Sequence, residues 1–506
     1  MANYKHYDYG QSKMLPVNFD EQILPGSFEY TLCYLIDHEL DLSVFDLRYS
    51  NDLGGAAAYD PAILLKIVLA AYARGITSSR QIEKLCRENI MFMALSADSQ
   101  PHFTTIAHFI SSMHDVITPL FTEVIAICSK AGLIGEELFA IDGCKLPSNA
   151  SKEWSGTQAD FEHKYKKIDR AVRRMLQKHR DEDAGGQVTD HKRRAAEAKQ
   201  IKRLREVSRT IKKRSRAMTD KIGHRGQPIN SNLTDNDSAK MKTSHGVIQG
   251  YIGVSAVDRK HQIIIGAEAF GEAQEHKLLQ PLVEQARKTV GKAYLRKARL
   301  TADAGFHNTD NIEYCRDQHI DGYIADKSFR KRDWRFQDYD RYKVKAEPNR
   351  AQRFTAADFH YDEKTKILTC PAGKALWLKT EDQAIGEYRY RMYQGYLRDC
   401  RVCSLQSKCM RKPPKENGRQ VAIQIGQSKH GKLNMLKTMQ TKLDSDQGRY
   451  IYSRRIGTVE PVFGNLTINK RLRRFTLRGK QKVNAQWLMW CMVHNIEKIQ
   501  KYGNVT

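Results

Sequence analysis

The chain has 506 residues, enough for two to four domains or for one domain with large insertions. Its 84 Lys and Arg against 58 Asp and Glu give a formal net charge of +26, which implies a polyanionic partner, either nucleic acid or a membrane surface. The longest apolar run, residues 62–73, is too short to span a bilayer, and residues 1–10 lack a signal-peptide core. These features argue against a membrane partner and predict a cytoplasmic protein.

The N-terminal part, residues 1–130, is predicted to be a helical domain. Asp60 as N-cap, Pro61 at the first helical position and Gly75 at the end mark one helix. Further helices are expected over 77–95 and 102–121. Short helices joined by tight turns are compatible with a helix-turn-helix-like DNA-binding module, although many helical bundles share this pattern.

Residues 158–218 are predicted to form two long charged helices broken at 181–186. Residues 164–225 contain 22 Lys and Arg but only 8 Asp and Glu. The hairpin could be a solvated surface, but an excess of one sign repels itself unless a polyanion binds, which favours contact with DNA phosphates. The expected contact residues are Lys192, Arg193, Arg194, Lys202, Arg203, Lys212, Lys213 and Arg214.

Strand and helix patterns alternate after this hairpin. Strands are expected over 246–258, 261–270 and 322–326, and a helix over 275–290. This order is typical of an α/β or α+β core built on a mixed sheet. Residues 327–450 are polar and basic, and are expected to be irregular.

Three acids are candidates for chemistry. Asp142 follows the apolar run 138–141 and Asp303 follows another short strand-like run, so both are expected at strand ends, where a sheet presents ligands. Asp followed by Gly is also ordinary turn chemistry. Glu460 is an acid in a basic helical stretch. Together the three could hold two divalent cations for phosphodiester chemistry, and Mg²⁺ suits oxygen ligands.

Eight short motifs in order resemble one family. They are "FAIDGCKLPSNASK" (139–152), "NLTDNDSAKMKT" (232–243), "QGYIGVSAVD" (249–258), "TADAGFHN" (301–308), "GYIAD" (322–326), "VEPVFG" (459–464), "RRFTLRG" (473–479) and the set Trp487, Cys491, His494, Asn495. The chain resembles the DDE-type transposases of bacterial insertion sequences, specifically the insertion-sequence eleven-eighty-two group of the IS-four-like superfamily. Residues 60–89 resemble the helical domain at the start of those proteins.

This resemblance implies a fold and an activity. The fold is an α/β, RNase H-like mixed-sheet catalytic core over 131–506, preceded by the all-helical domain, with insertions at 156–228 and 327–450. The implied catalytic and Mg²⁺-binding (or Mn²⁺-binding) residues are Asp142, Asp303 and Glu460. Such enzymes cut double-stranded DNA at terminal inverted repeats and join the freed end to target DNA. They usually act as dimers or larger assemblies, here in a bacterial nucleoid.

One position departs from the family pattern. Related enzymes carry a Lys seven residues after the catalytic Glu that contacts DNA near the cut, whereas this chain has Thr467. Nearby residues that could replace it as DNA contacts are Tyr452, Arg455, Lys470 and Arg471. The departure leaves open whether this copy is active. The alternatives are a non-catalytic DNA-binding regulator derived from a transposase, and a nuclease that cuts without joining.

Four of the ten cysteines are clustered: Cys370, Cys400, Cys403 and Cys409. A C-x2-C pair with two further cysteines in a basic segment suits a structural Zn²⁺ with four thiolate ligands. Free cysteines and an iron–sulfur cluster are the alternatives. Zinc is favoured because this segment has little apolar content with which to build a core.

Overall fold

The computed structural model describes residues 16–48, 54, 57–185, 191–223, 226–336, 353–363, 365–385, 388–427 and 432–503. Two compact units are present. Unit 1 holds the described residues up to His307, Tyr314–Ile324 and those from Tyr450 onward, and unit 2 holds Asn308–Glu313 and Ala325–Arg449. Residues 1–10, for which no signal-peptide core is expected, lie outside the described part of the chain.

The first elements of unit 1 are helical. They are α1 (Phe19–Gln22), α2 (Phe28–Tyr34), η1 (Leu35–Glu39), η2 (Leu42–Arg48), α3 (Pro61–Ala73), α4 (Ser79–Glu88), α5 (Ile90–Leu95), α6 (Phe103–Ser112), η3 (Met113–Asp115) and α7 (Ile117–Lys130). The predicted start of α3 is confirmed, since Asp60 caps it by accepting a 2.7 Å hydrogen bond from the Ala62 N–H.

Two predicted helices are each broken. The stretch 77–95 forms α4 and α5 because Asn89 adopts an extended backbone, with φ −116° and ψ 117°, and its side chain caps α5 through the Phe92 N–H. The stretch 102–121 is likewise divided into α6, η3 and α7. The helical content of this region is therefore confirmed, but the continuity of two helices is not.

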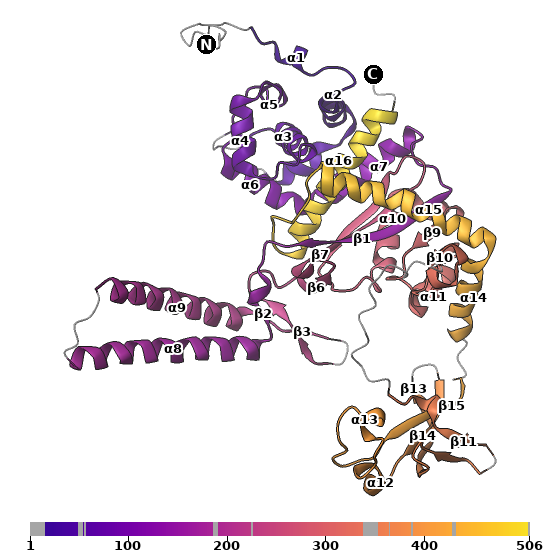
Figure 1. Cartoon of the computed structure of the whole chain (residues 1–506). Helices are drawn as coiled ribbons and strands as arrows, with labels where there is room; N and C mark the ends of the chain where they lie inside the picture. Colours follow the sequence, from indigo (N-terminus) through magenta and orange to yellow (C-terminus); the bar gives the residue numbers. More distant parts are fainter. Residues whose placement is uncertain are drawn as a thin grey trace, which may run out of the picture. The chain divides into compact units, whose positions relative to one another are not determined.

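The centre of unit 1 is a six-stranded mixed sheet (Figure 1). Its strands are β1 (Leu138–Pro147), β6 (Ala239–Thr243), β7 (Gly246–Asp258), β8 (Ile264–Phe270), β9 (Arg299–Ala302) and β10 (Gly322–Ile324). The order is β10-β9-β1-β7-β6, with β8 also paired to β7. β9 and β10 run parallel to β1, whereas β7 is antiparallel to β1 and β8 is antiparallel to β7. The expected mixed α/β architecture is present.

Helices surround this sheet. They are α10 (Leu279–Lys297), η8 (Asn465–Asn469) and α16 (Lys480–Tyr502), whereas α11 (Thr309–Asp317) and α15 (Asp446–Gly464) each begin in unit 2 and continue into unit 1. Nearly all residues of α16 from Val483 to Ile496 are buried, because α16 packs against both the sheet and the N-terminal helices. The rings of Tyr72 in α3 and Trp490 in α16 lie 4.8 Å apart. The predicted N-terminal helices and the end of the chain therefore share one core.

The outer edge of β8 is covered by side chains from α10 and α16. Asn495 accepts a hydrogen bond from the Ile264 N–H and donates one to the Ile264 carbonyl, both at 2.9 Å. Gln285 accepts from the Ala267 N–H at 3.1 Å, and Asn484 accepts from the Ala269 N–H at 2.9 Å. Main-chain groups that β7 does not pair are therefore satisfied by these helices.

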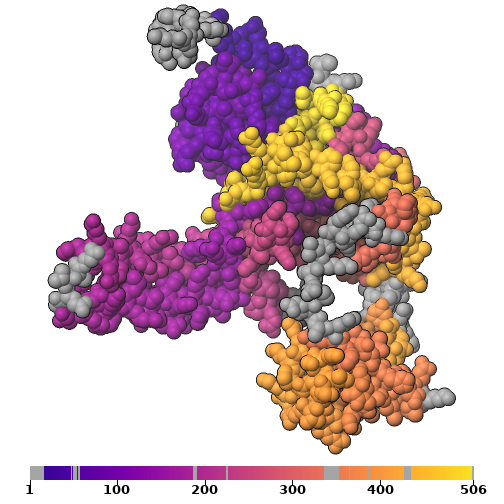
Figure 2. All heavy atoms as spheres, in the orientation of Figure 1, coloured from indigo at the N-terminus to yellow at the C-terminus, as the bar shows by residue number. Residues whose placement is uncertain are grey.

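An arm of two antiparallel helices, α8 (Gln158–Ala184) and α9 (His191–Ala217), is inserted between β1 and β7. Small strands lie at its base: β2 (Ser155–Gly156), β3 (Lys221–Ile222), β4 (Pro228–Ile229) and β5 (Ser231–Asn232), next to η4 (Lys152–Trp154). Its apolar core, which contains Phe161, Ile211 and Leu233, lies near the base. The two predicted helices are present, but α8 continues through most of the predicted break to Ala184, and Gly186 lies outside the described residues. In Figure 2 the arm extends beyond the neighbouring surface of unit 1.

The sequence had suggested that unit 2 is irregular, but it contains a five-stranded antiparallel sheet. Its elements are η5 (Arg330–Arg332), η6 (Trp334–Phe336), η7 (Ala356–Asp358), β11 (His360–Asp362), β12 (Ile367–Thr369), β13 (Ala375–Ile385), β14 (Tyr388–Gln394), α12 (Leu397–Arg401), α13 (Gln406–Cys409), β15 (Gln420–Gln427) and α14 (Lys432–Asp444). Its small core holds Phe359, Leu368, Leu376, Tyr393 and Val421. These five apolar residues are spread over a long polar segment. The sequence therefore showed no clear alternation of apolar and polar residues from which strands could be predicted.

Across the described residues no one helix has both the length and the apolar character needed to cross a membrane. Phe103–Asp115 and Ile117–Lys130 meet these criteria only as a pair, with a bend of 75° between them.

Candidate active site

Strand pairing brings Asp142 and Asp303 side by side. Ile141 in β1 is the register partner of Ala302 in β9, and the two strands are parallel. Asp142 and Asp303, which follow these two residues, therefore lie at the same level on neighbouring strands, which are about 4.8 Å apart. One expectation is corrected. β1 does not end at Asp142 but continues to Pro147, because β7 keeps pairing with it after β9 has ended.

Asp142 is largely buried and is neutralised by an arginine. Its Oδ2 accepts a 2.6 Å hydrogen bond from Nη1 of Arg455 in α15, and its Oδ1 accepts one from the Gly143 N–H at 2.8 Å. Burial raises the pKa of Asp142, Arg455 opposes this rise, and the neighbouring Asp303 adds to it. Arg455 is only 9% exposed, and its Nε has no hydrogen-bond partner among the described residues.

Asp303 forms a tight turn at the end of β9. Its Oδ1 accepts from the Gly305 N–H at 2.8 Å, and its carbonyl accepts from the Phe306 N–H at 3.2 Å. A Cβ added to Gly305 would lie 3.0 Å from the Asp303 Oδ1. Asp303 therefore has both the turn role that the sequence pattern allowed and a position beside Asp142.

Glu275 is a third carboxylate beside Asp142 and Asp303, and it was not among the acids predicted from the sequence. It lies in the connection between β8 and α10, and a Cβ added to Gly305 would come within 2.5 Å of its Oε2. Burial raises the pKa of Glu275 to about 7, Asp303 and Asp142 add to the rise, and Lys145 and Arg455 oppose it. No local sequence pattern indicated it. The antiparallel pairing of β1 with β7 and of β7 with β8 returns the chain to the edge where β1 presents Asp142.

Glu460 is placed differently from these acids. It is exposed on α15 and forms no ion pair with another described residue. Arg455 precedes it by five residues on the same helix, a rise of about 7.5 Å, but contacts Asp142 directly. Glu460 is also not among the main charges that shift the pKa of Asp142 or Glu275.

The carboxylate donors suit a hard divalent cation, but they are not arranged as a formed site. Within the described ranges, no three His, Cys, Asp or Glu side chains are grouped so as to hold a metal ion. The buried Arg455 Nε has no hydrogen-bond partner among the described residues, so this edge has a donor available for a further polar group.

The predicted DNA-contact residues of the arm lie along α9. Lys192, Arg193, Lys202, Arg203, Lys212, Lys213 and Arg214 are exposed, and Arg194 is half-buried and paired with Asp183. Arg193 is also paired, with Glu197 at 3.2 Å. The two helices are joined across the arm by a 2.6 Å contact between His179 and Glu197. Some of the positive charge therefore stabilises the arm, and the rest faces outward.

The residues suggested as substitutes for the missing lysine have different surroundings. Lys470 is 5% exposed and forms an ion pair with Glu497, so in this structure it faces the core and not a ligand. Arg455 points to Asp142, with its guanidinium 5.9 Å from the Tyr452 ring. Arg471 is exposed. Thr467 donates a hydrogen bond to the Phe463 carbonyl at 2.7 Å.

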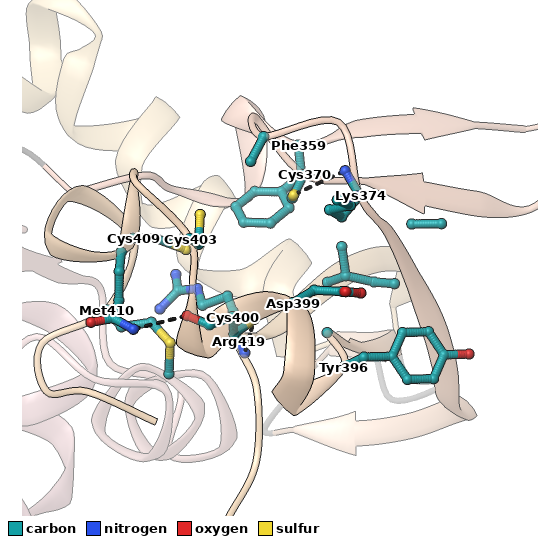
Figure 3. A pocket seen from close by; sticks show the side chains of 15 residues that line it. Phe359, Cys370, Lys374, Tyr396, Asp399, Cys400, Cys403, Cys409, Met410 and Arg419 are labelled. Atoms are coloured by element: carbon teal, nitrogen blue, oxygen red, sulfur yellow. Dashed lines mark hydrogen bonds between the residues drawn. The ribbon is translucent and has the colours of Figure 1, made fainter. Parts of the chain in front are cut away.

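The four clustered cysteines of unit 2 line one cavity of about 40 Å³ (Figure 3). The Lys374 N–H donates to Cys370 Sγ at 3.3 Å, and the Arg419 N–H donates to Cys400 Sγ at 3.5 Å. Burial raises the pKa of the Cys409 thiol, Arg419 lowers it, and the other three cysteines raise it further. The sulfurs are therefore electrostatic neighbours, although they do not form a closed ligand set.

Two family models match the chain. One, described as "Transposase domain (DUF772)", matches residues 17–112, and the other, described as "Transposase DDE domain", matches residues 369–500. The second span includes Glu460, whereas Asp142, Asp303 and Glu275 lie outside both. No curated protein matches the chain.

These matches indicate a transposase with a DDE domain. They point to the DDE-type transposases of insertion sequences, and the pairing of the two domains is consistent with the insertion-sequence eleven-eighty-two group.

Proposed function

We propose that this transposase binds the terminal inverted repeats of an insertion sequence and catalyses metal-dependent DNA cleavage and strand transfer. The observation that carries the proposal is the pairing of β1 with β9, which sets Asp142 beside Asp303 in a strongly basic chain with transposase domains. Double-stranded DNA, as element end and as target, accounts for a net charge of +26.

The catalytic core is proposed to be RNase H-like. Three antiparallel strands, β8, β7 and β1, are followed across the sheet by two parallel strands, β9 and β10, with Asp142 on the central strand. The proposed domain division keeps residues 1–130 as the DNA-binding helical domain and 131–506 as the catalytic domain, with insertions at 156–228 and 327–450.

The proposed catalytic residues are Asp142, Asp303 and Glu460. Bound Mg²⁺ or Mn²⁺ ions would activate the attacking oxygen and stabilise the leaving oxygen of the phosphodiester. Asp142 and Asp303 would hold these ions from the sheet, and Glu460 from α15. Arg455 neutralises Asp142, and Lys145 lies close enough to lower the pKa of Glu275, so the edge also carries positive charge suited to a phosphate.

DNA contact outside the reaction centre is assigned to the arm and the N-terminal helices. The exposed lysines and arginines of α9 would contact the phosphate backbone, which supplies affinity without sequence choice. Tyr452 and Arg471 remain proposed contacts near the reaction centre, and Lys470 is omitted because it is buried. A homodimer or larger assembly on DNA, in the cytoplasm with the nucleoid, is part of the proposal.

A structural Zn²⁺ is proposed for unit 2. Four cysteines line one cavity, and two main-chain N–H groups donate to their sulfurs, an arrangement that favours thiolates. The core of five buried apolar residues is small for a segment of this length. Purified protein is expected to contain about one zinc per chain by elemental analysis, and loss of that zinc in Cys403→Ser would support the assignment.

The deciding experiment uses a supercoiled plasmid that carries both ends of the element. Mg²⁺-dependent cutting and joining that disappear in Asp142→Ala are expected. Binding without cutting would instead identify a non-catalytic regulator, for which Thr467 in place of lysine is the main argument. Nicks without joined products would identify a nuclease.

A further inference from the structure

We propose that Glu275 is a catalytic residue of this reaction centre, supplying a carboxylate to a divalent cation together with Asp142 and Asp303. The inference rests on the proposed function. It adds an acid from the connection between β8 and α10 to the acids on β1, β9 and α15.

Glu275 lies at the same edge of the sheet as Asp142 and Asp303. β8 is antiparallel to β7, and β7 is antiparallel to β1, so the chain leaves β8 at the edge toward which β1 and β9 also run. Phe270, the last residue of β8, pairs with Ile252, which in turn pairs with Lys145 in β1. The connection that follows then brings Glu275 back to the level of Gly143.

Two glycines, Gly143 and Gly305, leave space for the Glu275 carboxylate. A Cβ added to Gly305 would lie 2.5 Å from Oε2 of Glu275 and 3.0 Å from Oδ1 of Asp303. A Cβ added to Gly143 would lie 3.4 Å from Oε1 of Glu275. These glycines directly follow Asp142 and closely follow Asp303 in the chain, so the absence of side chains at both positions lets the third carboxylate reach the first two.

Glu275 is accessible to a ligand, and the charges around it suit a phosphodiester and a divalent cation. Glu275 and Gly143 line an open groove of about 760 Å³, which Lys145, Lys242 and His245 also line. A phosphodiester in this groove would lie near both the lysines and the Glu275 carboxylate. Three carboxylates with Arg455 as their only directly hydrogen-bonded cation among the described residues carry excess negative charge, which a divalent cation would offset.

The test measures Mn²⁺ binding to the full chain by electron paramagnetic resonance, with DNA absent, so that the readout does not depend on activity. Glu275→Gln is expected to weaken Mn²⁺ binding at least about 10-fold and to reduce plasmid cutting, while circular dichroism stays unchanged. Glu275→Asp should retain part of both. Glu272→Gln, an exposed acid in the same connection, is the matched control and should bind Mn²⁺ like the parent protein.

A second variant tests the same idea without touching the acid. Gly305→Ala should displace Glu275 and weaken Mn²⁺ binding, whereas Gly457→Ala, whose added Cβ would meet no atom within 4 Å, should not. Parent-like Mn²⁺ binding in Glu275→Gln, with weakened binding in Asp303→Asn, would overturn the role of Glu275 and leave the proposed function intact. Parent-like binding in all three of Glu275→Gln, Asp303→Asn and Asp142→Asn would overturn the proposed metal site itself.

Discussion

The described residues contain two groups of side chains of the kinds that bind metals, and the fold positions them differently. The first gathering consists of Asp142, Asp303 and Glu275 in unit 1, and the second consists of the four clustered cysteines in unit 2. In unit 1, Asp142 and Asp303 are fixed by the main sheet, where residues flanking them such as Phe139, Ile141 and Ala302 are fully buried. The cysteines of unit 2 lie on turns and short helices around a core of five apolar residues. The first gathering is therefore expected to survive without its cation, whereas the second is expected to depend on its metal.

The largest expected effect concerns the first gathering. Asp142→Ala should lower the rate of plasmid cutting by more than about 1,000-fold, because several kcal/mol of transition-state stabilisation depend on the metal that this residue would hold. The variant also removes the hydrogen-bonded partner of the buried Arg455, so its stability is compared with that of Asp142→Asn, which keeps an acceptor for this arginine. Cutting rates and thermal melting are measured together, and a variant that cuts normally would contradict the assignment.

The next effect concerns the second gathering. A strong chelator, or Cys403→Ser, should make unit 2 sensitive to limited proteolysis while unit 1 stays resistant. Cys128→Ser is the control, because Cys128 is buried in α7 and lies outside the cysteine cavity. If unit 2 remains resistant after complete removal of zinc, the metal is not structural, and the small apolar core suffices.

An intermediate effect is expected for the arm. Replacing the exposed Lys202, Arg203 and Lys213 by alanine should reduce the slope of log affinity against log salt by about 2.7, since each phosphate contact contributes about 0.9. Alanine favours helix, so the arm should keep its structure. Gln200→Ala is the neutral control in the same helix. An unchanged slope would show that the arm does not bind DNA.

The smallest expected effect is a dependence of the stability of unit 1 on pH. Burial lowers the pKa of His494 to about 3, and its Nε2 is 2.9 Å from the Gln262 carbonyl. The unfolded chain takes up this proton near pH 6.5 and the folded chain does not, so the stabilisation is complete above pH 6.5 and declines as pH falls. Unit 1 should lose about 2 kcal/mol of unfolding free energy between pH 6.5 and 5 through this group.

His494→Gln should remove this part of the acid sensitivity, measured by urea unfolding with the fluorescence of the buried Trp487 and Trp490. His163→Gln, at an exposed position in the arm, should leave the pH dependence unchanged. Equal pH dependence in the two variants would show that His494 is protonated in the folded protein.

Local signals in the sequence were sufficient for several elements. Asp60 and Pro61 fix the start of α3, the charged periodic stretches give α8 and α9, and the apolar run 246–258 matches β7 throughout. The break at Asn89 was missed because the apolar period continues across it, and only the cap made by its side chain interrupts the helix.

The candidate site was predictable only in part. Asp303 directly follows a short apolar strand, which its sequence pattern indicated. The continuation of β1 beyond Asp142 depends on pairing with β7, which no local pattern reports. The approach of Glu275 to Gly143 and the contact between Arg455 and Asp142 join residues more than a hundred positions apart, so they arise from the sheet order and not from spacing along the chain.

The asparagines and glutamine that cover β8 have a consequence for assembly. A bare sheet edge can recruit a strand from another molecule and seed aggregation. Because Asn484, Asn495 and Gln285 already occupy the hydrogen-bonding groups there, a second protein copy cannot extend the sheet at β8 without first displacing α16. Any union of two copies on DNA must therefore be made through other surfaces.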